Sequence, residues 1–407
     1  MNGVCMMVIE NFQAKLRAYA ELMVRRGVNL RPGQLLILSA PIEAADFAHT
    51  VTEVAWELGA KDVLVRWGDN TGGELRLRHA SLDTLRDIPA WLAASYNDYA
   101  TDGCVFLALD TEFPPPQGLD PEKMSASRVA RMQGVVRWCI GSVATTAWAS
   151  LVYPELSPEA GLEALWHDVL FCTRALEDDP LAAWDAHIAR NNAYRDKLNA
   201  ARFTQLRFTS GLGTDLRVGL PLGYYFAGSQ ETDSRGDPFI ANMPSEEIFS
   251  APHRERVDGV VVASKPLFYN NTLVEGLRFT FEAGRVVEFS ADTGAEVIDK
   301  LLATDEGSSH LGEVALVPAE SLIARTGKLF YTTLYDENAA CHLALGASYP
   351  ESIAGGLAMS KDELVAAGMN QSLEHVDFMF GTPDLRVTGI DATGAETVVF
   401  ERGTWAL

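Results

Sequence analysis

The feature that most constrains the fold is an alternation of short apolar runs and longer helical patterns in the first third of the chain. The apolar runs are short, rich in leucine and valine and bounded by turn residues, as expected for strands that are buried on both faces. The three clearest lie at residues 34–39, 62–67 and 104–109. A fourth strand is expected at 146–153, and helices are expected at 11–26, 44–58, 83–99 and 121–134. Strands that alternate with helices predict a parallel, doubly wound sheet with helices on both faces.

Sheets of this kind often bind nucleotides, but the motifs for that function are missing. No G-x-G-x-x-G follows the first predicted strand, and the chain contains no G-x-x-x-x-G-K-[ST]. The glycine clusters at 71–73 and 211–213 are predicted to be turns, because glycine mostly marks backbone positions with positive φ. We therefore expect the first domain to be a scaffold or lid without a cofactor site.

The pattern changes near residue 203. Residues 158–201 predict two helices that are interrupted near Asp179 and Pro180, and short strand-like segments with few helices follow. Such a run of strands predicts an α+β domain built on mixed or antiparallel sheet. A chain of 407 residues is also too long for one ordinary core. We predict an α/β scaffold or lid domain at 1–200 and an α+β catalytic domain at 201–407.

Composition limits the partners and the compartment. The formal net charge of −22 argues against nucleic acid, which requires basic patches. The five cysteines are scattered without a C-x-x-C, which indicates a reducing compartment. Charged residues interrupt any signal sequence, and the longest uncharged run, 138–154, is shorter than the roughly 20 residues of a membrane span. We expect a cytoplasmic protein with no membrane partner.

A His-x-Asp pair lies near the end of the chain, within an apolar segment at 373–381 that is predicted to be a strand. Side chains alternate between the faces of a strand, so His375 and Asp377 point the same way. A neighbouring imidazole and carboxylate suit a divalent metal, although an isolated pair of this kind is more often a hydrogen-bonded pair in a core.

Three further segments of the second half offer ligand-type residues. Glu246 and Glu247 precede an apolar run, Glu313 begins another, and His342 follows Glu337 by five positions. Four such segments in one domain are hard to attribute to chance. The remaining histidines are predicted to be structural or surface residues or mere neighbours of carboxylates: His49, His79, His167, His187, His253 and His310.

Together these motifs resemble the M29 family of metallo-aminopeptidases, the aminopeptidase T and S group. The resemblance is carried by N-x-P-x-E-E-[VI]-F at 242–249, G-E-V-A-L-V-P at 312–318, D-E-N-A-x-C-H-x-A-L-G at 336–346 and N-x-S-x-x-H-V-D-F-M-x-G at 370–381. Their order and spacing match across the whole chain.

The resemblance implies a pair of divalent cations (zinc, cobalt or manganese) and a homodimer that encloses a cavity. The matching ligand positions are Glu247, Glu313, His342, His375 and Asp377, with Glu313 as a bridge and Glu337 as a further ligand. Tyr349 matches a tyrosine beside the metals. Glu246 matches no ligand and is expected to be solvated or to neighbour a ligand. Asn338, Asn370 and Ser372 are expected to orient ligands.

The chemistry of this residue set is consistent with a hydrolase. Three or four carboxylates would be nearly neutralised by two divalent cations. Paired cations lower the pKa of a water molecule, and the resulting hydroxide can attack the carbonyl of a peptide whose free α-amine is held nearby. Tyr349 would donate a hydrogen bond to the oxyanion. The general base stays open between Glu313, Glu337 and the hydroxide itself.

Two other functions stay open at this point: a two-metal hydrolase of another amide or a phosphoester, and a non-enzymatic metal-binding protein. The interpretation makes one geometric demand. His375 and Asp377 must project toward Glu247, Glu313 and His342, while Val376 and Phe378 face a core.

Overall fold

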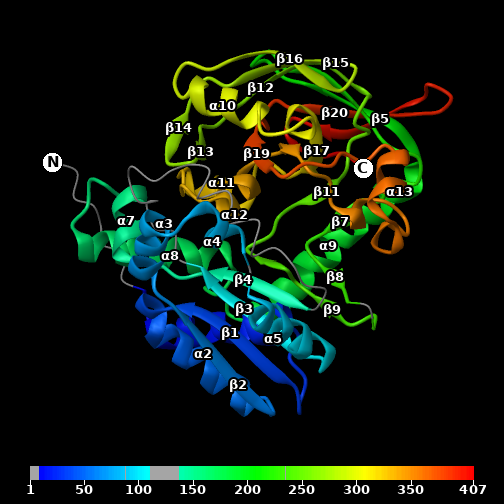
Figure 1. The fold of residues 1–407 in the computed structure, drawn as a ribbon. Coiled ribbons are helices and arrows are strands. Elements are labelled where there is room, and N and C mark those ends of the chain that lie inside the picture. Colours follow the sequence, from blue (N-terminus) through cyan, green and yellow to red (C-terminus); the bar gives the residue numbers. More distant parts are fainter. Residues whose placement is uncertain (1–8, 88, 111–136, 234) are drawn as a thin grey trace. The chain divides into compact units, whose positions relative to one another are not determined.

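The computed structural model describes residues 9–87, 89–110, 137–233 and 235–407 (Figure 1). The chain forms two compact units. The first comprises residues 1–186 and 230–244, and the second comprises 187–229 and 245–407. The predicted domains at 1–200 and 201–407 stay a prediction.

A parallel five-stranded sheet with the order β10-β4-β3-β1-β2 forms the centre of the first unit. Its strands are β1 (Leu35–Pro41), β2 (Asp62–Gly68), β3 (Val105–Asp110), β4 (Trp138–Ser142) and β10 (Asn242–Met243). The first three correspond to the predicted strands, because leucine- and valine-rich runs fit a sheet that is covered by helices. The connection from β2 to β3 passes over β1, so the direction in which strands are added reverses there. The expectation of a parallel sheet is confirmed.

The described helices of this unit are α1 (Phe12–Leu22), α2 (Ala45–Glu57), α3 (Asn70–His79), α4 (Leu82–Arg86), α5 (Ala90–Thr101), α7 (Thr146–Val152), α8 (Pro158–Cys172) and α9 (Pro180–Ala201), which continues into the second unit. A π-helix at Met23–Gly27 follows α1, and β8 (Glu231–Thr232) pairs with β9 (Pro238–Phe239). The predicted interruption near Pro180 is confirmed. The predicted helix at 121–134 lies outside the described residues.

Three local predictions in this unit were wrong. Residues 146–153 form helix α7 and not a strand, because the Thr145 side chain caps the helix by accepting from the Trp148 N–H, and the strand is the preceding run, β4. Length and hydrophobicity alone do not separate a short buried helix from a strand. The glycines at 72–73 lie in the first turns of α3 and not in a free turn. The helix expected at 83–99 is divided: α4 ends at Arg86, where Asp87 has extended backbone, and α5 begins at Ala90.

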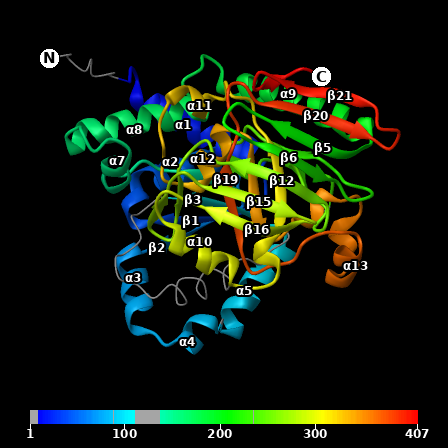
Figure 2. The ribbon, with the colours of Figure 1, turned by 90° about the horizontal axis from the view of Figure 1, so that it is seen from above.

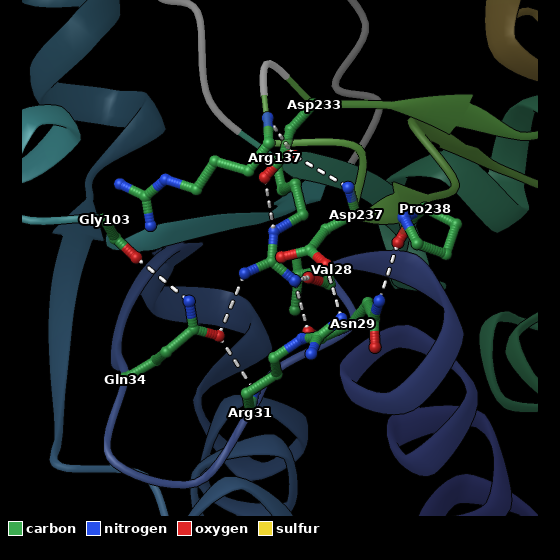
Figure 3. A network of polar contacts seen from close by, with 10 residues as sticks. Val28, Asn29, Arg31, Gln34, Gly103, Arg137, Asp233, Asp237 and Pro238 are labelled. Atoms are coloured by element: carbon green, nitrogen blue, oxygen red, sulfur yellow. Dashed lines mark hydrogen bonds and ion pairs between the residues drawn. The ribbon is translucent and has the colours of Figure 1, made fainter.

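A buried arginine fastens residues 233–238 to the N-terminal part of the first unit (Figure 3). The Arg137 guanidinium is only 3% exposed, and its Nε lies 3.2 Å from Asp233 Oδ2. It also donates to the carbonyl of Asn29 and to Gln34 Oε1. Arg31 pairs with Asp237 on the same segment. A buried guanidinium needs a charge partner and several acceptors, so this segment completes the unit.

Two antiparallel sheets form the second unit. One has five strands in the order β19-β18-β17-β11-β7, and the other has eight in the order β16-β15-β12-β6-β5-β20-β21-β22. Figure 2 shows β5, β6, β12, β15 and β16 lying side by side in the larger sheet. The five-stranded sheet contains β7 (Ala227–Gly228), β11 (Ile248–Ser250), β17 (Leu311–Leu316), β18 (His342–Gly346) and β19 (His375–Met379).

The larger sheet contains β5 (Phe203–Thr209), β6 (Asp215–Gly219), β12 (Val257–Val262), β15 (Arg278–Glu282), β16 (Arg285–Ser290), β20 (Arg386–Asp391), β21 (Glu396–Glu401) and β22 (Thr404–Trp405). The other elements of the unit are the hairpin β13 (Leu267–Tyr269) and β14 (Thr272–Val274), and the helices α10 (Ala295–Leu302), α11 (Leu322–Thr326), α12 (Thr333–Asp336) and α13 (Lys361–Ala366). The prediction of many strands and few helices is confirmed.

The main core of this unit draws on both sheets. Phe208 and Phe279 of the larger sheet belong to the same buried cluster as Val314, Leu343 and Phe378 of the smaller one. On the smaller sheet every second residue contributes to this core, so the intervening residues point to its other face.

Within the described parts of the chain, no helix is both long and apolar enough to cross a membrane.

Candidate metal centre

The face of the five-stranded sheet that is turned away from the core carries the predicted metal ligands. Val376 and Phe378 of β19 pack into the core, and the alternation places His375 and Asp377 on the opposite face. The same alternation selects Glu313 on β17, between the core residues Leu311 and Val314 across a local bulge, and His342 on β18. The geometric demand made from the sequence is confirmed.

The first group of ligand-type side chains consists of Glu247, Glu313 and His342, with one potential ligand atom of each residue within 4.8 Å of the others. His342 Nε2 lies 3.1 Å from Glu247 Oε2 and 3.4 Å from Glu313 Oε1. All three residues are buried. Two carboxylates and one imidazole at this spacing form a suitable site for a divalent cation.

The second group consists of Glu313, His375 and Asp377 at the same mutual spacing. His375 Nε2 lies 3.5 Å from both Glu313 Oε2 and Asp377 Oδ1. Glu313 therefore takes part in both groups and turns a different oxygen toward each histidine. This arrangement suits a carboxylate between two cations.

Hydrogen bonds on the far side of each ring fix which nitrogen faces the carboxylates. His375 Nδ1 lies 2.8 Å from the Ala347 carbonyl, and His342 Nδ1 lies 3.2 Å from the Ala340 carbonyl. A carbonyl only accepts, so both Nδ1 atoms carry the proton, and a neutral ring presents its Nε2 lone pair to the carboxylates. Among the described residues, His342 Nε2 and Asp377 Oδ1 are buried without a hydrogen-bond partner. Lone pairs that face carboxylate oxygens across 3.1–3.5 Å fit a cation between them.

The pKa shifts of these side chains show the cost of burying several carboxylates close together. Burial raises the pKa of Glu313 to about 7, although both histidines oppose this shift. Burial disfavours the charged form of His375, but Asp377 and Glu313 outweigh it and raise the pKa of the ring to about 9. Burial, together with Asp377 and Glu247, raises the pKa of Glu337 well above its usual value. Without a cation, protons must supply the positive charge that this cluster of carboxylates requires.

Glu337 and Tyr349 border these groups. Glu337 is half-buried and belongs to neither group, but it lies within electrostatic reach of Asp377 and Glu247. The Tyr349 ring lies over the His375 ring with 4.6 Å between centroids. Burial and the charges of Glu313 and Asp377 raise the pKa of Tyr349 well above its usual value, so the hydroxyl keeps its proton and can donate it in a hydrogen bond.

For two residues near this centre the sequence left two alternatives open, and the structure selects the buried one in each case. Glu246 is only 4% exposed, so it is a buried neighbour of a ligand and not a solvated residue. His187 is buried as well, and its Nε2 lies 2.7 Å from the Ser245 carbonyl. Among the other histidines that the structure describes, none belongs to either ligand group. Nothing local in the sequence signals the contact of His187, because its partner is 58 residues away.

The second unit thus brings together two overlapping groups of imidazole and carboxylate side chains that could each hold a metal ion. Residues 12–405 match the sequence profile of the family described as thermophilic metalloprotease (M29), and the chain belongs to this family.

Characterised relatives align along almost their full length. The chain is 37% identical over 410 residues to aminopeptidase AmpS of Bacillus subtilis, and the alignment covers 98% of this chain and 100% of the relative. It is 41% identical over 414 residues to aminopeptidase T of Thermus thermophilus, with the same coverage.

A solved structure is similar as well. Wild-type AmpT from Thermus thermophilus matches with a TM-score of 0.89 at 40% identity, over 97% of this chain and 100% of that chain. The homologues are thus named aminopeptidases, and the family is one of metalloproteases.

Proposed function

We propose that this protein is a metallo-aminopeptidase that removes N-terminal residues from peptides. The observation that carries the proposal is Glu313, which directs one carboxylate oxygen toward His342 and the other toward His375. A carboxylate shared by two imidazole–carboxylate groups suits two divalent cations. The aminopeptidase activity of the named relatives supports the choice of substrate.

In this proposal Glu247 and His342 would hold one cation and His375 and Asp377 the other, with the Glu313 carboxylate shared between the two groups. Glu337 would be a further ligand. Zinc, cobalt or manganese ions, when bound, would polarise the scissile carbonyl and lower the pKa of the attacking water. The residues of the chain orient the reaction. The Tyr349 hydroxyl donates a hydrogen bond to the developing oxyanion. The general base is Glu313, Glu337 or the hydroxide itself without a separate carboxylate base.

We also propose that the protein acts as a cytoplasmic homodimer, with 1–200 as scaffold or lid and 201–407 as catalytic domain. The family resemblance supports the dimer. Cys104, Cys139 and Cys341 are buried free thiols, which suits a reducing compartment.

A phosphoesterase is supported less well. Phosphate recognition would require arginines that are free to bind it. Three arginines of the second unit that could be candidates for this role already have protein partners: Arg254 pairs with Glu306, Arg386 pairs with Glu401, and Arg256 donates to the carbonyls of Thr204 and Leu220. We therefore favour a peptide as substrate over a phosphoester or a purely metal-binding role.

A blocked N-terminus should abolish cleavage. We expect a leucine-initiated peptide to be hydrolysed and its N-acetylated form to be cleaved with kcat/KM lower by at least about 10³-fold, equivalent to about 4 kcal/mol of transition-state stabilisation. Product analysis by mass spectrometry measures both rates, and a phosphate monoester serves as a third substrate. Equal cleavage of free and acetylated peptides would rule out an aminopeptidase, and turnover of the phosphate ester alone would favour the alternative hydrolase.

Tyr349→Phe should lower kcat by about 10²–10³-fold with little change in KM, because it removes a hydrogen bond that is made only in the transition state. Steady-state kinetics on a leucine peptide measures the two constants separately. Tyr194→Phe is the matched control, since Tyr194 stacks on Trp405 and belongs to neither ligand group. An unchanged kcat in the Tyr349→Phe enzyme would show that the hydroxyl has no role in the mechanism.

A further inference from the structure

We infer that His187 and Asn338 are positioning residues that clamp one peptide group, the one joining Ser245 to Glu246, and thereby fix Glu247 in the metal centre. This inference rests on the proposed function, because Glu247 is one of the proposed ligands. The two residues lie 58 and 92 positions from their contacts on this peptide, so the clamp is made entirely by tertiary structure.

The carbonyl side of the peptide is held from helix α9. His187 Nε2 lies 2.7 Å from the Ser245 carbonyl oxygen, and the Ser229 hydroxyl donates to the same oxygen at 3.3 Å. Asn191, one helical turn after His187, donates to the Ser229 hydroxyl at 2.9 Å. Residues four apart share a helix face, so His187 contacts this carbonyl directly while Asn191 acts on it through Ser229.

The protonation pattern of His187 follows from its partners. The Ser245 carbonyl accepts only, so Nε2 must carry a proton. Arg190 Nη2 lies 3.0 Å from Nδ1, and a guanidinium donates only, so Nδ1 must be the acceptor. These two contacts favour the Nε2–H tautomer, which aims its donor at the peptide.

The N–H side of the same peptide is held from the opposite direction. The Glu246 N–H donates to Asn338 Oδ1 at 2.6 Å. Asn338 is fully buried, and its own amide group donates to the Leu334 carbonyl at 3.1 Å and to Glu337 Oε1 at 3.4 Å. Asn338 thus links the backbone before Glu247 with the side chain of Glu337.

The clamp determines the directions in which the Glu246 and Glu247 side chains leave the backbone. Glu246 Oε2 lies 4.0 Å from His187 Nδ1, whereas Glu247 Oε2 lies 3.1 Å from His342 Nε2. The two side chains therefore leave the backbone in different directions. A rotation of the clamped peptide would change the direction of both, and Glu247 would lose its place opposite His342. Partners that orient ligands in this way typically contribute a factor of about 10–100 to metal affinity.

The test is metal affinity in the full-length protein, measured by competing zinc against a chelator of known affinity. We expect His187→Ala and Asn338→Ala each to weaken one of the two zinc-binding steps by about 10–100-fold. The other step, assigned to His375 and Asp377, should change little. His187→Gln, which keeps a side-chain N–H donor, should recover most of the lost affinity.

A variant that carries both substitutions tests whether His187 and Asn338 act through the same peptide group or independently. If both residues act on one peptide group, His187→Ala with Asn338→Ala should weaken binding little more than the stronger single variant. Independent roles would instead multiply the two losses, and that result would overturn the inference. Wild-type affinity in either single variant, or a His187→Gln protein no tighter than His187→Ala, would also overturn it.

Two further proteins complete the design. His167→Ala is the matched control, since His167 stacks on Phe171 in helix α8 and takes no part in the clamp. Ser229→Ala removes the weaker donor to the Ser245 carbonyl and the acceptor of the Asn191 amide. It serves as the test if the alanine variants do not fold. A loss of affinity of a few-fold supports the clamp, and unchanged affinity overturns it. Wild-type protein that binds no zinc would instead reject the proposed function.

Discussion

Glu313→Gln is expected to lower kcat/KM on a leucine peptide by at least about 10³-fold, equivalent to about 4 kcal/mol. The amide cannot supply two anionic oxygens, so it cannot serve both histidines as Glu313 does. The fold should persist, because the change is nearly isosteric and removes a buried charge that lies near Asp377 and Glu247.

The measurement combines steady-state kinetics with the thermal midpoint of unfolding of the metal-free protein. Glu306→Gln is the control, because Glu306 is an exposed carboxylate of the same unit that pairs with Arg254. A Glu313→Gln enzyme that retains activity would contradict the bridging role. A metal-free variant with a much lower midpoint than the metal-free wild type would show that Glu313 serves the fold.

Chelation of the bound cations is expected to abolish hydrolysis and to lower the midpoint of thermal unfolding. A ligand present at about 1,000 times its dissociation constant stabilises the folded state by about 4 kcal/mol. For a unit of about 200 residues, this corresponds to a shift of roughly 10 °C. The buried carboxylates add to the effect, because their charges repel one another when the cation is removed.

Calorimetry and activity should be recorded before chelation, after exhaustive dialysis, and after zinc, cobalt or manganese is restored. Recovery of both midpoint and activity on restoring a cation would support the metal centre. Full activity in protein with a measured metal content of zero would rule out the metal-dependent mechanism. In Glu313→Gln the stabilising effect of added cation should be much smaller than in the wild type.

The parts of the centre that could be predicted from sequence are those governed by local periodicity. His375 and Asp377 share a face because a strand has a period of two, and the apolar residues between and after them had to face a core. The spacing of Glu313 from Val314 and Leu316 follows the same rule. A local pattern therefore predicted the side of the sheet on which the ligand-type residues lie.

The parts that could not be predicted depend on contacts between distant segments. The burial of Glu246 follows from helix α9, whose His187 lies 4.0 Å away in space but 59 positions earlier in sequence. Helix α7 was missed because a short apolar run is compatible with either a strand or a helix until its cap is known. Glu337 follows a short helix that is defined by tertiary contacts, and the sequence does not place its carboxylate relative to the two ligand groups.

The segment at 230–244 has a consequence for synthesis on the ribosome. It supplies β10 to the parallel sheet and Asp233 to the buried Arg137, so the first unit lacks an edge strand and an ion-pair partner until residue 244 has left the exit tunnel. By then β5 and β6 of the second unit have already emerged. We expect the N-terminal unit to fold late during translation, and a nascent chain arrested before residue 230 to be more sensitive to proteases than one arrested well after 244.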